Sequence, residues 1–264
     1  MSRIRIGVGG WVFEPWRGGA FFPAGLAQSR ELHYASRQLS SIEINGTYYG
    51  SQKPASFAKW HDETPDDFVF AVKGPRFATN RKVLAEAGPS IDRFFGSGVM
   101  ELKDKLGPVN WQFMATKRFD PDDFAAFLAL LPREVDGRPV RHAVEVRHAS
   151  FRTPDFVALA RAHGVAVIVD ADSHFPQIAD VTAPFLYVRI MGTAADEPAG
   201  YPPPALDAWA GRARRWAAGE APDDLPLVAD PPDATPRDVF LYVISGAKER
   251  NPAAAMALIE RTAG

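Results

Sequence analysis

Residues 141–151 contain the first set of side chains whose types and spacing could do chemistry. The segment reads RHAVEVRHASF, so a short run of small and β-branched residues ends on Glu145, Arg147 and His148. A carboxylate and an imidazole can move protons, and a guanidinium can bind an anion through two parallel hydrogen bonds. An apolar strand that ends on these three groups therefore predicts a functional site at its carboxyl end.

Other apolar segments end in the same way, namely residues 41–49, 68–76, 165–172 and 185–192. A further strand-like segment, residues 108–113, carries a glutamine near its end. The polar side chains at these ends are Glu43, Asn45, Lys73, Gln112, Asp170 and Arg189. No single one of them names a reaction, but their shared position predicts that the strand ends form the site.

Strand-like and helix-like segments alternate eight times along the 264 residues. The strand-like segments are near-continuous apolar runs, as expected of strands buried on both faces. One helix-like segment is weak, because residues 172–181 lack the spacing of an amphipathic helix. The alternation predicts an α/β fold with a parallel sheet, closed into a single TIM-type (β/α)8 barrel over residues 1–264. The rival open sheet would carry a GxGxxG loop after its first strand, which residues 7–10, GVGG, do not match.

Composition restricts the classes of function. The chain has 30 basic and 32 acidic residues, a net charge of −2, so any anion-binding surface must be local. It has no cysteine, which excludes disulfides, a thiolate nucleophile and cysteine-ligated metals. No apolar run approaches the ~20 residues of a membrane helix, and the first residues lack a signal-peptide core. We therefore expect a soluble, cytoplasmic protein with no membrane association, and no protein partner can be inferred.

Acid–base catalysis needs a titratable group within reach of a substrate. Glu43 and Glu145 are the best candidate carboxylates and His148 is the best candidate proton shuttle, because all three stand at strand ends that share one mouth of a barrel. The same residues also fit a structural interpretation. The carboxylates can belong to a salt-bridge network that fills the top of the barrel, and His148 can bond to the backbone at the end of its strand.

The cations predict an anion-binding mouth. Lys73, Arg147 and Arg189 come from three different strands, and guanidinium groups suit carboxylate or phosphate ligands. Aromatic residues stand in the neighbouring loops, at Trp11 and Trp16 in residues 9–23 and at Tyr48. We expect Trp11 or Trp16 to border the mouth, because the loops that follow barrel strands all emerge on one side. The alternative is that these indoles cap the barrel end as part of its core.

A divalent metal remains open but is not favoured by the residues. It would draw its ligands from Glu43, Glu145, Asp170, Asp172, His148 and His174, and oxygen ligands of this kind suit magnesium or manganese better than zinc. The chain contains no HxH or HExxH pair. No other cofactor can be named from the sequence.

Three functions are compatible with these residues. The first is an enzyme acting on an anionic, phosphorylated or nucleotide-like substrate, with phosphoester hydrolysis as the leading reaction. The second is a non-catalytic protein that binds a nucleic-acid end or an anionic metabolite in the same mouth. The third is a sugar-acting enzyme that uses Glu43 and Glu145 as paired carboxylates.

Several segments resemble the YecE-like family, also called domain of unknown function 72. They are IGVGGWVFEPWRGGAFFP, SIEINGTYYGSQKPASFAKW, FVFAVKGPR, LKDKLGPVNWQF, AVEVRHASF and LYVRIMG. The resemblance covers almost the whole chain and implies a TIM-type barrel without implying a reaction. Three positions depart from the family pattern, because the family usually has histidine at Met191, a proline-containing turn at 113–115 and an asparagine pair at 245–246. A role of those family residues in metal binding or catalysis would therefore not carry over to this chain.

Overall fold

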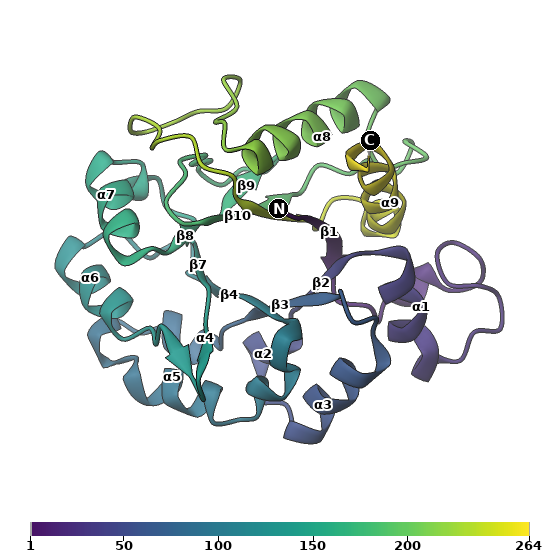
Figure 1. The fold of residues 1–264 in the computed structure, drawn as a ribbon, viewed down its shortest axis with the longest axis horizontal. Coiled ribbons are helices and arrows are strands. Elements are labelled where there is room, and N and C mark those ends of the chain that lie inside the picture. The colour runs from purple at the N-terminus through teal and green to yellow at the C-terminus, as the bar shows by residue number, and fades with distance from the viewer. Residues whose placement is uncertain (1, 264) are drawn as a thin grey trace.

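Among the residues that the computed structural model describes, 2–263, nine strands form one parallel sheet that curls into a barrel, with the helices around it (Figure 1). The strands, in chain order, are β1 (Ile4–Gly9), β2 (Ser41–Ile44), β3 (Val69–Lys73), β4 (Leu106–Gln112), β7 (His142–Glu145), β8 (Ala166–Val167), β9 (Val169–Ala171), β10 (Phe185–Ile190) and β11 (Asp238–Val243). Their order in the sheet is β8-β7-β4-β3-β2-β1-β11-β10-β9. A separate hairpin of β5 (Glu134–Val135) and β6 (Arg138–Pro139) precedes β7.

The ring closes through the sixth strand of the barrel. That strand is split at Ile168 into β8 and β9, which stand at the two ends of the sheet order. β8 pairs with β7, where Ala166 lies opposite Ala143, and β9 pairs with β10, where Val169 lies opposite Val188. The predicted TIM-type barrel is therefore confirmed.

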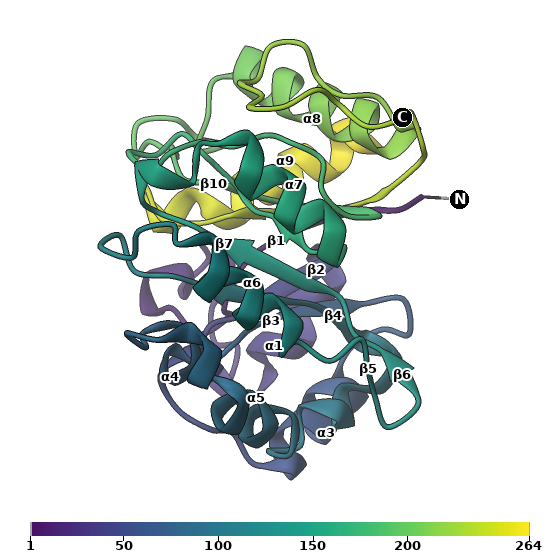
Figure 2. The same ribbon diagram turned by 90° about the vertical axis from the view of Figure 1, so that its left-hand side faces the viewer.

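The helices surround this ring. They are α1 (Glu31–Gln38), α2 (Gly46–Tyr49), α3 (Pro54–Glu63), α4 (Arg76–Thr79), α5 (Gly88–Phe95), α6 (Pro121–Ala129), α7 (Pro154–His163), α8 (Pro203–Ala218) and α9 (Asn251–Thr262). Figure 2 shows α7, α8 and α9 on one side of the barrel and α3, α4 and α5 on the other. No helix between residues 2 and 263 has both the length and the apolar composition needed to cross a membrane.

Local sequence signals account for several helix boundaries. The Asp120 carboxylate accepts a hydrogen bond from the backbone N–H of Asp123, and the Thr153 hydroxyl accepts one from that of Phe156. Each cap is followed by a proline at the first helical position, where the missing N–H costs nothing. Residues 172–184, which lack a helical pattern, form no helix in the structure.

The barrel interior is layered along its axis. Near the amino ends of the strands, the Arg141 guanidinium lies over the rings of Phe185 and Phe240, at 5.9 and 5.0 Å from their centroids. The rings of Tyr187 and Tyr242 follow, with centroids 5.1 Å apart. Above these aromatic layers the inward side chains become charged, and they form the candidate site.

Candidate functional site

The register of the sheet brings the predicted strand-end residues together. Arg189 lies opposite Asp170 across β10 and β9, and Gln112 lies opposite Glu145 across β4 and β7. Lys73 lies opposite Asn110 across β3 and β4. Because the carboxyl ends of all strands in such a barrel line one mouth, these groups meet at one end of it.

Glu43 is fully buried at the end of β2 and is held by three neighbours. One carboxylate oxygen accepts from the Tyr187 hydroxyl and, at 3.2 Å, from Asn110 Nδ2. The other accepts from Arg189 Nη2 at 3.2 Å. Burial alone would raise the pKa of Glu43, but Arg189, Lys73 and the tyrosine hydroxyl outweigh it, so the pKa is lowered and the carboxylate stays ionised.

Glu145 is its counterpart at the end of β7. Its Oε2 atom accepts from Asn110 Nδ2 at 3.2 Å and lies 2.9 Å from Arg189 Nη1. Its Oε1 atom is paired with the Arg147 guanidinium, whose Nε lies 2.7 Å away. Burial opposes ionisation here too, but Arg189, Lys73 and Arg147 lower the pKa of Glu145 to about 2.

Arg189 stands at the centre of the cluster and is only 3% exposed. Its Nη2 atom donates to Glu43, whereas its Nη1 atom approaches Glu145 without an N–H group directed at the oxygen, so that contact is an ion pair rather than a hydrogen bond. Its Nε atom has no hydrogen-bond partner among the described residues. Despite burial, the surrounding carboxylates raise the pKa of Arg189, and it is permanently charged.

Asp170 differs from the two glutamates. It is 1% exposed, and neither of its carboxyl oxygens has a hydrogen-bond partner among the described residues. Arg189 Nη1 lies 4.0 Å from its Oδ1 atom. Burial and the neighbouring Glu145 carboxylate raise the pKa of Asp170 well above its usual range, because Arg189 is already engaged by the glutamates. Asp170 is therefore the carboxyl group of this cluster that is suited to carry a proton.

Lys73 closes the cluster at the end of β3. Its Nζ atom donates to Gln112 Oε1, lies 4.0 Å from Glu145 Oε2 and is covered by the Tyr48 ring, whose centroid is 5.5 Å away. Burial and the nearby Arg189 charge lower the pKa of Lys73. Tyr48 comes from the short helix α2, so this loop element helps to enclose the amine.

Two residues of the cluster were not predicted from the sequence. Asn110 bridges Glu43 and Glu145 through one amide nitrogen, and Tyr187 donates to Glu43. The signal that could have found them is the period of two along a strand. Asn110 stands two residues before Gln112, and Tyr187 stands two residues before Arg189, so each shares the inward face of its strand.

The His148 ring is hydrogen-bonded within its own loop. Its Nδ1 atom accepts a hydrogen bond from the backbone N–H of Ser150 at 3.1 Å and lies 2.9 Å from the Ser150 hydroxyl. No hydrogen bond among residues 2–263 joins its ring to Glu43 or Glu145. This geometry matches the structural interpretation, in which the imidazole bonds to the backbone at the end of its strand.

The two tryptophans of the first loop have different surroundings. Trp16 is 1% exposed, packs against Phe13, Phe21 and Phe22, and donates from Nε1 to the Lys248 carbonyl at 2.8 Å. It therefore joins the loops after β1 and β11 as part of the core. Trp11 is half-buried and lines a hollow of about 320 Å³ together with Asn45, which follows β2.

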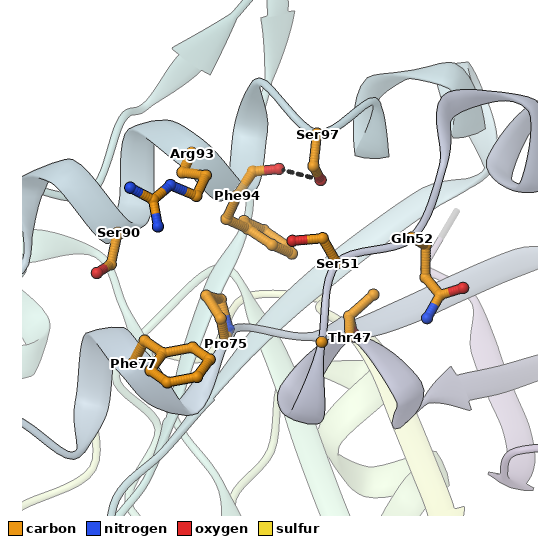
Figure 3. Close-up of a pocket in the computed structure, with 10 residues that line it drawn as sticks. Thr47, Ser51, Gln52, Pro75, Phe77, Ser90, Arg93, Phe94 and Ser97 are labelled. Atoms are coloured by element: carbon orange, nitrogen blue, oxygen red, sulfur yellow. Dashed lines mark hydrogen bonds between the residues drawn. The ribbon is translucent and has the colours of Figure 1, made fainter.

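A second hollow, of about 100 Å³, lies beside α2 on the side of α4 and α5 (Figure 3). Its lining includes Phe77 and Phe94 together with Ser51 and Arg93 (Figure 3). The predicted site residues do not line this hollow. The charged cluster and the hollow are thus separate features of the same end of the barrel, separated by α2.

Within residues 2–263, no group of three or more histidine, aspartate or glutamate side chains is placed to hold a metal ion. The two glutamates of the mouth are instead engaged by nitrogen donors, chiefly Arg189 and Asn110. The donor set of this cluster therefore offers no ready metal site.

Comparison with known proteins agrees with this architecture. A model of the family described as protein of unknown function DUF72 matches residues 5–263. UPF0759 protein YecE of Escherichia coli K12 is 30% identical over 151 residues, which make up 56% of this chain and 50% of that protein. The chain thus spans about half the length of the curated relatives it matches.

Solved structures of the family have the same fold. A DUF72 family protein of Thermotoga maritima superposes with a TM-score of 0.67 at 23% identity, covering 97% of both chains. A DUF72 family protein of Enterococcus faecalis gives a TM-score of 0.71 at 16% identity, covering 99% of this chain and 96% of the other. With the family model matching nearly the whole sequence, the chain belongs to the DUF72 family.

Proposed function

We propose that the barrel mouth is the active site of an enzyme that acts on an anionic, phosphorylated or nucleotide-like substrate, with phosphoester hydrolysis as the leading reaction. The observation that carries this proposal is Asp170, a buried carboxyl group with a raised pKa and two unpartnered oxygens beside Arg189. Buried polar groups are nearly always hydrogen-bonded. Asp170 therefore supports a site that is completed by a ligand.

The charge of the mouth is nearly balanced before any ligand enters. Two guanidinium groups, those of Arg147 and Arg189, face two glutamates whose pKa values are lowered. A protonated Asp170 adds no charge, so the net charge of the mouth depends on whether Lys73 is protonated. An anion beside Lys73 favours its charged form. We therefore expect anion binding to be accompanied by proton uptake at this amine.

In the proposed reaction Asp170 is the general acid. As water forms its bond to phosphorus, the bond between phosphorus and the leaving oxygen breaks, and the Asp170 carboxyl group gives that oxygen a proton. The attacking water loses a proton to solvent, and Asp170 regains one when the product leaves. Two unpartnered groups support the geometry, since Arg189 Nε can hold a phosphoryl oxygen and Asn110 Oδ1 can orient the water.

The paired glutamates give less support to a sugar-acting enzyme. Glu43 Oε2 and Glu145 Oε2 each lie 3.2 Å from Asn110 Nδ2, so they are at most twice that distance apart. That limit is compatible with the roughly 5–5.5 Å between the carboxyl groups of retaining glycosidases and falls short of the roughly 6.5–9.5 Å of inverting ones. Such an enzyme also needs one of the two protonated, however, and both have lowered pKa values. The pair is better suited to holding Arg189 in place.

The test is turnover of p-nitrophenyl phosphate and bis(p-nitrophenyl) phosphate, with and without magnesium or manganese. We expect the wild type to hydrolyse at least one of them, and Asp170→Asn to be slower by roughly 10²–10⁴-fold, the usual contribution of a general acid. Asp155→Asn, on the exposed first turn of α7, is the matched control and should retain full activity. Binding of these compounds without turnover would contradict the enzyme and leave the non-catalytic binding protein.

A further inference from the structure

We infer that the Lys73 amine is a nucleophile that forms an imine with small carbonyl compounds carrying a carboxylate, such as 2-oxo acids. This chemistry goes beyond the proposed function and does not require phosphoester hydrolysis. Lys73 ends β3 and points into the barrel mouth, where its side chain is nearly buried but keeps some contact with solvent. Amines in such partly desolvated places are typical of lysines that form imines.

A second buried lysine shows why Lys73 is unusual. Lys105 is 3% exposed, and its ammonium donates to the carbonyl groups of His61 and Thr64 and to the Thr64 hydroxyl. Three acceptors match the three N–H groups of a charged ammonium. Lys73 has one hydrogen bond, to Gln112 Oε1, and its nearest carboxylate is 4.0 Å away. Its surroundings therefore satisfy an uncharged amine better than an ammonium.

Charged groups from several strands face this amine. Arg189 on β10 and Arg147 beyond β7 disfavour the ammonium, whereas Glu43 and Glu145 favour it. Burial adds to the effect of the arginines and prevails, so the pKa of Lys73 is lowered. A larger fraction of Lys73 is thus uncharged at neutral pH than of an exposed lysine, and the uncharged form is the one that attacks carbonyl carbon.

The remaining groups of the mouth supply the other needs of the reaction. The nitrogen lone pair of Lys73 forms a bond to the carbonyl carbon, and the carbonyl oxygen takes a proton from the Asp170 carboxyl group. The nitrogen then loses its two protons as the carbon–oxygen bond breaks. One proton joins the departing hydroxyl group to form water, and the other returns to the Asp170 carboxylate. The products are one imine and one water. The carboxylate of the ligand is matched by Arg147, whose side chain is 21% exposed at the edge of the cluster.

The experiment uses glyoxylate as the probe and sodium cyanoborohydride as the reductant. Hydride from the reductant converts the C=N bond of an imine into a stable amine, which peptide mass spectrometry locates on the chain. At neutral pH and millimolar glyoxylate, we expect Lys73 to be labelled roughly tenfold faster than exposed Lys59 for each unit by which its pKa is lowered. Lys73→Arg, which keeps the charge but is not nucleophilic, should lose the label at this position alone.

Inorganic phosphate provides the link to the proposed function. An anion in the mouth favours the charged form of Lys73 and occupies the space beside it, so millimolar phosphate should slow labelling of Lys73 and leave Lys59 unaffected. Labelling of Lys73 no faster than that of Lys59 in the wild type would overturn the inference, whether or not the Lys73→Arg variant folds. Labelling involves no phosphoester, so Lys73 can be labelled even if the hydrolysis assay shows no turnover. Equally, turnover can be observed even if Lys73 is not labelled.

Discussion

At the scale of single residues, the three carboxyl groups of the mouth differ in their hydrogen-bond donors and therefore in their pKa values. Glu43 and Glu145 share Arg189 and the Asn110 amide, and both have lowered pKa values. Asp170 reaches neither donor within hydrogen-bond distance, and its pKa is raised. The surroundings thus favour the anionic form of the two glutamates and the protonated form of Asp170, which is the division of roles that acid catalysis requires.

The raised pKa of Asp170 has a consequence for stability. Its pKa in the folded chain is above the value of 3.8 expected when it is unfolded, so the folded state binds the extra proton and stability is lost as pH rises above 3.8. Asp170→Asn removes this loss. We expect the variant to be more stable than the wild type at neutral pH by on the order of 1 kcal/mol, although much slower in the hydrolysis assay. Urea denaturation at several pH values measures it, and a variant less stable at neutral pH would contradict the assignment of the proton.

Asn110 should tolerate little change, because its Nδ2 atom donates to both glutamates. Asn110→Asp removes those donors and adds a third acid among them, which we expect to cost roughly 3 kcal/mol or more at neutral pH. The loss should shrink as pH falls and the new carboxyl group is protonated. Asn45→Asp is the control, since the one hydrogen bond described for the Asn45 side chain within residues 2–263 is a 3.5 Å contact with the Glu43 carbonyl. Equal effects of the two changes in denaturation would show that Asn110 does not hold the pair.

Much of this cluster could be predicted from the sequence, because strand ends in a barrel all point to one mouth. The residues that were missed, Asn110 and Tyr187, lie one layer deeper, where polar side chains within apolar strands look like ordinary core positions. The sequence also could not tell which carboxyl group holds the proton. That depends on which of them reaches Arg189, and this is settled only when β2, β7 and β9 are placed around β10.

At the scale of elements, short loop segments hold the mouth in shape. The helices α2 and α4 follow β2 and β3, and each has only four residues. The Thr47 hydroxyl of α2 donates to the Lys73 carbonyl at 2.6 Å, while the next residue, Tyr48, lies over the Lys73 amine. Helices this short have no hydrophobic period, which is why the sequence pattern did not reveal them.

The first and last loops of the barrel are joined by Trp16. Trp16→Phe removes the hydrogen bond from its indole to the Lys248 carbonyl and leaves a gap in a buried aromatic cluster. We expect a loss of roughly 2–3 kcal/mol in the free energy of unfolding. Trp11→Phe is the matched control, because no hydrogen bond described for residues 2–263 involves its indole, and it should cost less. A larger loss in Trp11→Phe, measured by urea denaturation, would contradict the joining role of Trp16.

At the scale of the whole molecule, the mouth is rich in charged groups, whereas the chain as a whole is almost neutral. Its net charge is −2, so no global field draws anions to it. Two arginines and two ionised glutamates nearly cancel in the mouth, and the protonation state of Lys73 decides the remaining charge. We therefore propose that anion binding in this molecule is local and draws a proton to Lys73.

Sulfate titration by calorimetry tests this claim most directly, because sulfate does not itself change protonation near neutral pH. The titration is run in two buffers with different heats of ionisation. We expect millimolar binding with a heat that depends on the buffer, since Lys73 takes up a proton, and Lys73→Met should lose that dependence. Wild-type protein that binds neither sulfate, phosphate nor nucleotide at millimolar concentration would contradict the anion-binding mouth and leave a salt-bridge network that only stabilises the barrel.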